Sequence, residues 1–298
     1  MKHAYLIMAH KNDYTLSTLL GMLDYPNNDI FLHFDAKDNS FDRKAMIALK
    51  GLLNQAKLYF TDRICVTWGG YSEIKCELLL LEKAISTGKY DYYHLLSGED
   101  LPIKTHEYIE WFFESNAGSQ FLDTCPARSD GDYHDLDRVK YFHFAQEKMG
   151  KKEAVELPLL WRSIRKITFV FQDKLNVYRS TKIEFMRGAQ WFSITHELAD
   201  YIVKKKNWIE KTFRWTKCAD EMFLQTLIHN TEFEKQVSNL GSLRCVDWKR
   251  GMPWIWREDD MDCLIKSDKL FARKFDSSVD KSIIKRIKDS YNKKHIMR

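Results

Sequence analysis

Apolar residues in the first 120 positions form short unbroken runs, separated by longer stretches in which they recur every three or four residues. The runs 4–10, 29–35, 57–66 and 91–96 have the length and continuity of strands that are buried on both faces. The stretches between them predict helices, over 71–86 and 105–115 and around Leu16, Leu19, Leu20 and Leu23. This alternation predicts an α/β fold with a mostly parallel central sheet flanked by helices.

Polar and small residues follow each predicted strand, at the edge where an open parallel sheet binds its ligands. They are His10, Lys11 and Asn12 after the first strand, Asp35 after the second, Trp68 and Gly69 after the third, and Ser97, Gly98, Glu99 and Asp100 after the fourth. The sequence contains neither the glycine-rich dinucleotide fingerprint nor a P-loop. A nucleotide would therefore be bound by another geometry at this edge.

The second half of the chain begins with an irregular stretch, 124–187, and such stretches inside compact domains are usually functional. Regular structure then returns, and we expect a strand over 188–195 followed by helices over 196–206 and 218–230. Asp220 and Glu221 stand at the predicted start of the last helix, where acidic residues are favourable.

No linker separates the two halves, so we predict one domain over 1–276. Its first half, 1–123, is expected to bind the nucleotide, and its second half, 124–276, to hold the acceptor and the catalytic residues. A basic helix is predicted to follow over 277–298. This helix combines seven Lys and Arg residues with an apolar stripe of Ile283, Ile284, Ile287 and Tyr291. The stripe can lie on an anionic membrane surface or pack against its own domain. Nucleic acid is disfavoured as a partner, because the basic residues do not alternate with stacking aromatics.

The composition is that of a globular protein, with 44% apolar residues and a net charge of +5. Six cysteines occur without any C-x-x-C spacing, which favours reduced thiols. The apolar run near the start is too short for an export signal, and no apolar run is long enough to span a bilayer. We expect a cytoplasmic protein, with peripheral contact on the inner face of the cytoplasmic membrane as an option.

Three Asp-x-Asp sequences are candidate metal sites, at Asp130 and Asp132, Asp135 and Asp137, and Asp260 and Asp262. Such a pair can hold a divalent ion against a nucleotide diphosphate. None of the three follows a predicted core strand, so surface carboxylates are the preferred interpretation. Three histidines in or beside strands are interpreted as core or rim residues rather than zinc ligands: His10, His33 and His94.

Cations and tryptophans gather in the last third of the chain, after a strand that ends at Asp247. The cluster contains Lys249, Arg250, Trp254, Trp256, Arg257 and Lys274. Fixed positive charge suits a departing diphosphate, and tryptophan faces suit a sugar ring. An ordinary charged surface is the alternative interpretation.

Five motifs in order resemble the core-2/I-branching glycosyltransferase family, which includes β-1,6-N-acetylglucosaminyltransferases and peptide O-xylosyltransferases. They are WGGYS (68–72), LLSGEDLPIK (95–104), GAQWFSIT (188–195), ADEMFLQT (219–226) and LFARKFD (270–276). The resemblance covers roughly residues 4 to 276. It implies a GT-A type nucleotide-sugar fold, a UDP-sugar donor, inversion at the anomeric carbon and no metal cofactor.

The resemblance also implies residue roles. Glu221 matches the family's catalytic base, although Ala219 replaces the usual proline, and Lys274 matches the lysine that binds the diphosphate. The second diphosphate cation is left open between Arg257 and Arg250, with Lys249 third. Asp35, and more weakly His10, match residues that contact the uridine. The donor and acceptor pocket is expected to contain Trp68, Gly69, Ser97, Gly98, Glu99, Asp100, Trp191, Asp220 and Trp254.

These residues predict an inverting, metal-independent transferase that moves N-acetylglucosamine, or else xylose, from a UDP-sugar to a glycan hydroxyl. The family's eukaryotic members carry a Golgi anchor and disulfides, features that this sequence does not suggest. We therefore expect a bacterial member that acts in surface-polysaccharide assembly. Its glycan acceptor is lipid-linked in one version of this hypothesis. Two alternatives stay open. One is an inactive carbohydrate- or nucleotide-sugar-binding protein, and the other is a metal-dependent transferase that uses Asp130 and Asp132.

Overall fold

The computed structural model describes residues 1–298 apart from 129–134, 145, 150–157, 180–181, 252 and 293–298. Its main sheet has the order β3-β2-β1-β4-β8 and consists of β1 (His3–Ala9), β2 (Asn28–Phe34), β3 (Lys57–Phe60), β4 (Tyr92–Ser97) and β8 (Ser193–Thr195). The first four strands are parallel and β8 is antiparallel to β4. The predicted α/β fold with a mostly parallel central sheet is confirmed.

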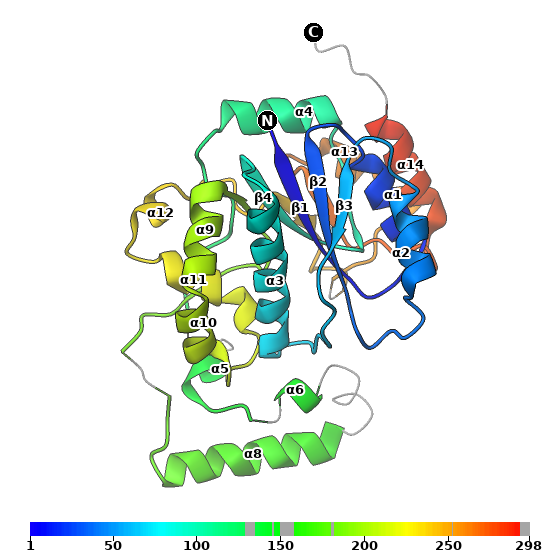
Figure 1. The fold of residues 1–298 in the computed structure, drawn as a ribbon. Helices are drawn as coiled ribbons and strands as arrows, with labels where there is room; N and C mark the ends of the chain where they lie inside the picture. The colour runs from blue at the N-terminus through cyan, green and yellow to red at the C-terminus, as the bar shows by residue number, and fades with distance from the viewer. Residues whose placement is uncertain (129–134, 145, 150–157, 180–181, 252, 293–298) are drawn as a thin grey trace.

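The two faces of this sheet are covered by different helices (Figure 1). One face packs against α1 (Tyr14–Met22), α2 (Arg43–Lys50), α4 (His106–Ser115) and α14 (Lys281–Tyr291), and the other against α3 (Tyr71–Thr87), α9 (His196–Lys204), α10 (Lys206–Phe213) and α11 (Phe223–Ile228). Alternation along β1 explains the division: Tyr5 and Ile7 belong to the first core, whereas Ala4 and Leu6 belong to the second. All four side chains are buried, as the unbroken apolar run predicted.

Side-chain caps fix where several helices begin. Asp13 accepts a hydrogen bond from the amide of Leu16 at α1, and Asp42 does the same for Ala45 at α2. Asp280 caps α14 through the amides of Ser282 and Ile283. These caps satisfy amide groups at the first turns of α1, α2 and α14.

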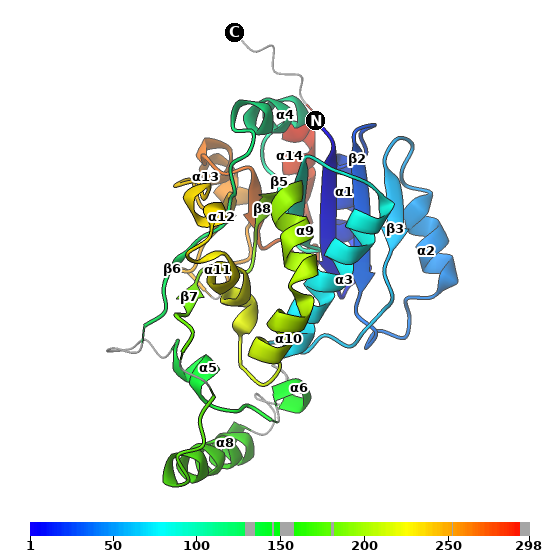
Figure 2. The same cartoon turned by 60° about the vertical axis from the view of Figure 1, so that its left-hand side comes forward.

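Two smaller sheets complete the second half. One has the order β5-β10-β9, from β5 (Asp100–Pro102), β10 (Phe271–Arg273) and β9 (Arg244–Val246), and the other pairs β6 (Cys125–Pro126) with β7 (Met186–Arg187). The described residues also form the 17-residue helix α8 (Pro158–Lys174). The shorter elements are α5 (Asp137–Lys140), α6 (Gln146–Met149), η1 (Ala219–Glu221), α12 (Glu232–Lys235), η2 (Glu258–Asp260) and α13 (Met261–Lys266). Strands from both halves thus share the main sheet and the β5-β10-β9 sheet (Figure 2).

Arg244 joins the main sheet to the β5-β10-β9 sheet. Its buried guanidinium donates hydrogen bonds to the backbone oxygens of Leu95 and Phe192, each at 2.8 Å, and to Oγ of Ser193 at 2.8 Å. The same group lies over the ring of Phe271. This arrangement satisfies a buried charge with backbone and hydroxyl acceptors, which is what burial of a cation requires.

The C-terminal helix packs against its own domain. Ile283, Ile284, Ile287 and Tyr291 are buried in the first core, and α14 contacts α1, α13, η2 and β5. The membrane interpretation of this stripe is therefore wrong, because its apolar face is already covered by protein. Among the described residues, no helix combines the length and hydropathy that a bilayer-crossing segment needs.

Several predicted element boundaries differ from the structure. The third strand stops at Phe60 instead of continuing to 66, and the guanidinium of Arg63 donates to the backbone oxygens of the loop after β2. Of the strand predicted over 188–195, only Ser193–Thr195 pairs in the sheet. The helix predicted over 218–230 becomes the 3-10 turn η1 followed by α11, because Cys218 has left-handed backbone torsions with φ of 48°.

Candidate functional site

A cavity of about 1040 Å³ opens at the carboxyl ends of the parallel strands. Among the residues that line it are nine predicted ones: His10, Asp35, Trp68, Ser97, Glu99, Trp191, Asp220, Glu221 and Lys274. They come from loops after β1, β2, β3 and β4 and from three segments of the second half. The parallel topology thus brings residues more than 200 positions apart into one site.

The Ser97-Gly98-Glu99-Asp100 turn forms one wall of this cavity. Asp100 is buried and accepts hydrogen bonds from the amide of Ser97 at 2.9 Å and from its hydroxyl at 2.6 Å. Gly98 passes close to β1, where an added Cβ atom would lie 3.1 Å from the Cβ of Ala9. The turn is therefore closed by its own residues and packed tightly on the end of the first strand.

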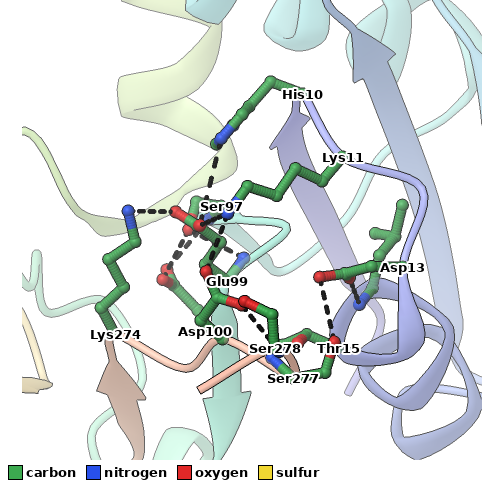
Figure 3. Close-up of polar contacts among 12 residues, drawn as sticks. His10, Lys11, Asp13, Thr15, Ser97, Glu99, Asp100, Lys274, Ser277 and Ser278 are labelled. Atoms are coloured by element: carbon green, nitrogen blue, oxygen red, sulfur yellow. Dashed lines mark hydrogen bonds and ion pairs between the residues drawn. The ribbon is translucent and has the colours of Figure 1, made fainter. Parts of the chain in front are cut away.

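Two consecutive acids of this turn pair with two consecutive bases at the end of β10, and Figure 3 shows the pair of Glu99 and Lys274. Glu99 Oε2 lies 2.8 Å from Lys274 Nζ, and Asp100 Oδ1 lies 2.9 Å from a guanidinium nitrogen of Arg273. The antiparallel register of β5 and β10, which sets Arg273 opposite Asp100, produces this match. Sequence reasoning missed Arg273. The signal available in the sequence was that two consecutive acids, Glu99 and Asp100, could pair with two consecutive bases, Arg273 and Lys274.

Glu99 also lies close to two side chains from the loop after β1, Lys11 and His10. Its Oε1 accepts a hydrogen bond from Nζ of Lys11 at 3.1 Å and lies 4.0 Å from Nε2 of His10. Burial acts to raise the pKa of Glu99, but the charge and hydrogen bond of Lys274, with help from His10 and Lys11, lower it overall. Lys11 is held in turn by Asp276 at 2.9 Å (Figure 3). Glu99 is consequently ionised and lies close to three basic side chains, those of Lys274, Lys11 and His10.

Glu221 faces the cavity with 42% of its side chain exposed. One of its oxygens, Oε2, accepts a hydrogen bond from Arg138 at 2.7 Å. Burial acts to lower the pKa of Arg138, but the hydrogen bond and charge of Glu221 raise it overall. Arg138 therefore holds one carboxylate oxygen of Glu221. The irregular stretch around Arg138 gave no sequence signal for this partnership.

Two glycines fix the backbone of the segment that carries Glu221. The amide of Gly188 donates to the carbonyl oxygen of Glu221 at 2.8 Å, and the amide of Cys218 donates to the carbonyl of Gly69 at 2.8 Å. Gly69 has φ of 70°, and a Cβ atom on Gly188 would come within 1.8 Å of the carbonyl oxygen of Asp123. Both positions accept only glycine without rearrangement.

A pair of buried carboxyl groups lies directly behind Glu221. Asp220 interacts with Glu73 of α3, whose Oε2 accepts a hydrogen bond from the amide of Gly69 at 2.7 Å. Burial, followed by the charge of Glu221, raises the pKa of Asp220 to about 7. Burial and the charge of Asp220 raise the pKa of Glu73 well above its ordinary value. Because two like charges this close cannot both ionise easily, the pair retains a proton near neutral pH.

Asp35 lies at the carboxyl end of β2 and lines the cavity. Its backbone amide donates to the carbonyl of Ala9, and its Oδ1 accepts from the amide of Lys37 at 2.9 Å. On the opposite wall the guanidinium of Arg273 lies over the ring of Trp191, 4.4 Å from its centroid. Trp68 keeps half of its surface exposed at the mouth. The described lining of the cavity therefore includes the carboxylate of Asp35, the stacked planar groups of Arg273 and Trp191, and the half-exposed ring of Trp68.

Arginines of the loop after β9 were predicted to bind the diphosphate, but they do not line the cavity. Arg250 pairs with Asp247 at 2.6 Å and with Asp260 at 2.7 Å, and it stacks on Trp254. Arg257 also lies over the ring of Trp254, 5.0 Å from its centroid. Neither arginine is among the residues that line the cavity, and neither is Trp254, Lys249, Gly69, Gly98 or Asp100. The cationic lining comes instead from Lys37, Arg187, Arg244, Arg273 and Lys274.

The Asp-x-Asp candidates have other partners or fall outside the description. Asp130 and Asp132 lie outside the described residues. Asp135 is buried and binds Arg187 at 3.1 Å, and Asp260 accepts hydrogen bonds from Trp254 and Arg250. Within the described part of the chain, no three His, Cys, Asp or Glu side chains are grouped as a metal site.

The α/β fold with a cavity at the carboxyl ends of its strands is consistent with a GT-A-like glycosyltransferase. A family model described as Core-2/I-Branching enzyme matches residues 3–263. The chain belongs to this family of glycosyltransferases.

Similar proteins include xylosyltransferase sqv-6 of Caenorhabditis elegans, 25% identical over 305 residues that cover 91% of this chain and 34% of the relative. The N-acetyllactosaminide beta-1,6-N-acetylglucosaminyl-transferase of Homo sapiens is 24% identical over 300 residues, which cover 92% of this chain and 68% of the relative. Xylosyltransferase 2 of Rattus norvegicus is 21% identical over 310 residues, 94% of this chain and 32% of the relative. The chain thus spans about a third of the length of these xylosyltransferases.

Proposed function

We propose that the protein transfers a sugar from a UDP-sugar to a hydroxyl group of a glycan, with inversion at the anomeric carbon and without a metal ion. N-acetylglucosamine is the first candidate sugar and xylose the second, because relatives carry names for both transfers. The observation that carries the proposal is that one cavity is lined by both an exposed carboxylate, Glu221, and a pair of cations, Arg273 and Lys274.

Glu221 is proposed as the general base. In an inverting transfer one carboxylate suffices: it takes the proton of the acceptor hydroxyl as this oxygen attacks the anomeric carbon from the face opposite the diphosphate. Such proton transfer contributes roughly 10²- to 10⁴-fold in rate. Arg138 binds Oε2 of Glu221, which leaves Oε1 as the oxygen that can receive the proton.

Lys274 and Arg273 are proposed to meet the departing diphosphate. At an effective dielectric constant near 20, a unit charge about 4 Å away stabilises the developing negative charge by roughly 4 kcal/mol before desolvation costs. Arg273 thereby takes the role that we expected of Arg257 or Arg250, since it lines the cavity and these two are engaged with Trp254. Glu99 and Asp100 position the two cations rather than bind a metal in this proposal.

The remaining lining residues have proposed binding roles. Asp35, with His10 nearby, contacts the uridine at the ends of β2 and β1. Trp191, whose ring already stacks with Arg273, borders the donor sugar. Donor choice between the two sugars depends on a few atoms of this wall.

We further propose that the reaction belongs to the assembly of bacterial surface polysaccharide in the cytoplasm. All six cysteines fall within the described residues and are free thiols, which supports a reducing compartment. The acceptor is then a growing glycan that this compartment supplies.

The test is a UDP-release assay against a panel of UDP-sugars, run with and without EDTA, on the wild type and Glu221→Gln. We expect turnover that EDTA does not reduce, and a loss of turnover in Glu221→Gln with UDP affinity retained. Glu232→Gln, at an exposed position on α12, is the matched control and keeps full activity.

The other outcomes identify the alternatives. No turnover with any donor, despite nucleotide-sugar binding, indicates an inactive binding protein. Loss of activity in EDTA indicates a metal-dependent transferase, for which Asp130 and Asp132 are the first residues to substitute. Normal turnover by Glu221→Gln contradicts the assignment of the base.

A further inference from the structure

Helix α8 presents an apolar strip to solvent. We define the α8 strip as Ile167, Val170, Phe171 and Leu175, which are 67%, 47%, 62% and 55% exposed. Their spacing of three and four residues places them on one face of the helix, continued into the turn that follows it. Exposed apolar side chains occur singly on most protein surfaces, but four neighbouring ones on one helix face mark an interaction surface.

The opposite face of α8 is attached to the protein. Phe169 stacks on Tyr141 with ring centroids 4.4 Å apart, and the side chain of Gln172 exchanges hydrogen bonds with the backbone amide and carbonyl of Phe142. Asp173 accepts a hydrogen bond from the hydroxyl of Tyr141 at 2.9 Å. These contacts fix the rotation of the helix, so the α8 strip points away from the body. Figures 1 and 2 show α8 at the extremity of the molecule, beyond the ends of the parallel strands.

The charge on this helix favours an anionic partner. Residues 158–177 contain Arg162, Arg165, Lys166 and Lys174 against a single acid, Asp173. Lys166 and Lys174 are exposed beside the α8 strip. An apolar face flanked by lysines is the pattern of a helix that lies in the plane of a membrane surface, with its apolar side chains among the acyl chains and its cations among anionic headgroups.

A second copy of the chain fits this surface less well. In a two-fold symmetric contact each α8 strip would meet its own equivalent, and the two clusters of positive charge would be brought together. Like charges at short range oppose such a contact, whereas anionic lipid neutralises them.

We propose that the α8 strip docks the protein on an anionic membrane surface. The helix that performs this role differs from the C-terminal helix that the sequence suggested, whose stripe is buried. Figure 1 shows α8 beyond the carboxyl ends of the parallel strands. The cavity is lined by residues from the same ends of these strands. A consequence that rests on the proposed function is that the glycan acceptor is carried on a lipid in the same membrane.

The test is cosedimentation of the full chain with vesicles, in the absence of donor and acceptor. We expect binding to phosphatidylcholine vesicles that contain phosphatidylglycerol and little binding to phosphatidylcholine alone. Ile167→Asp and Phe171→Asp are each expected to lower the partition coefficient roughly tenfold or more. The matched control is Ile47→Asp on α2, where the side chain is 61% exposed on another face.

A charge-reversal variant, Lys166→Glu with Lys174→Glu, tests the electrostatic part without changing an apolar residue and is expected to abolish the preference for anionic vesicles. Thermal unfolding of each variant checks that the fold is retained. The proposal is overturned if the wild type does not bind anionic vesicles, or if Ile47→Asp lowers binding as much as Ile167→Asp. It is equally overturned if the protein is a dimer that Ile167→Asp converts to a monomer, because a second copy then covers the strip.

Vesicle binding and sugar transfer are measured separately, so failure of one leaves the other interpretable. A protein that binds anionic vesicles but turns over no UDP-sugar supports docking and contradicts the proposed function. A protein that turns over UDP-sugar but does not bind vesicles supports the proposed function and contradicts docking.

Discussion

Nζ of Lys274 lies 2.8 Å from Oε2 of Glu99, and the neighbouring residues Arg273 and Asp100 pair in the same way at 2.9 Å. The acids come from the turn after β4 and the bases from the end of β10, about 175 positions away. Glu99 also lies 3.1 Å from Nζ of Lys11, which pairs in turn with Asp276, so three carboxylates and three cations meet at this corner of the cavity. Arg273 and Lys274 both line the cavity, which is why the proposed function places the diphosphate here.

Substitution of Lys274 tests this assignment. Loss of a charged hydrogen-bond donor to the diphosphate is expected to raise the Kd for UDP by about 10- to 100-fold in Lys274→Ala. Isothermal titration calorimetry with UDP measures the effect, and Lys285→Ala on the exposed side of α14 is the control. Equal affinities for the wild type and Lys274→Ala would place the diphosphate elsewhere.

Arg138 is expected to act as a positioning residue for the base. In Arg138→Gln the carboxylate of Glu221 loses its 2.7 Å partner and its fixed orientation, so kcat is expected to fall by up to about 100-fold. UDP affinity should be unchanged, and Arg138→Lys should recover part of the rate. A parallel loss of UDP affinity would mean instead that Arg138 binds the donor.

The buried pair of Glu73 and Asp220 predicts a dependence of stability on pH. The pKa of Asp220 is about 7 in the folded protein against an ordinary value of 3.8 for the unfolded chain. Between these pH values the folded protein holds a proton that the unfolded chain has released, so this contribution to stability is present at low pH and is lost as the pH rises through about 7.

Glu73→Gln removes one of the two acids and should flatten this dependence. We expect the fall in unfolding free energy between pH 5 and pH 8 to be smaller than in the wild type by at least about 1 kcal/mol, as measured by urea denaturation. Glu82→Gln, on the same helix but paired with Lys206, should behave as the wild type does. Parallel curves for all three proteins would exclude a shared proton.

Arg244 is predicted to stabilise the junction of the two sheets. Arg244→Met removes the guanidinium donor from the backbone oxygen of Leu95 and leaves that of Phe192 with the amide of Leu95 alone, so it is expected to cost at least about 2 kcal/mol of unfolding free energy. Urea titration measures the loss. Arg43→Met, at the exposed start of α2, should change stability by less than about 0.5 kcal/mol. A small effect at Arg244 would mean that water or other donors satisfy these oxygens.

The sequence was most informative where a pattern was local. The first four strands and the helices α1, α3 and α4 were predicted to within a few residues, except that β3 ends at Phe60, and the helix α2 between β2 and β3 was not predicted. Buried parallel strands require unbroken apolar runs, and the predicted helices showed a three-to-four-residue spacing of apolar residues. The segment around Glu221 was predicted less well. The left-handed Cys218, whose amide donates to Gly69, and the bond from the amide of Gly188 to the carbonyl of Glu221 accompany a 3-10 turn where a helix start was expected.

The sequence by itself determined the α/β order, the edge at which the site lies, and the candidates Glu221, Glu99 and Lys274, because these depend on neighbours in the chain or on short motifs. Only the tertiary structure decided which cations reach the cavity, that Arg138 contacts Glu221 and Glu73 contacts Asp220, and which amphipathic helix keeps its apolar face exposed. The physical reason is that charge pairing and burial depend on distances between segments far apart in the sequence, and β-strand register, rather than composition, sets those distances.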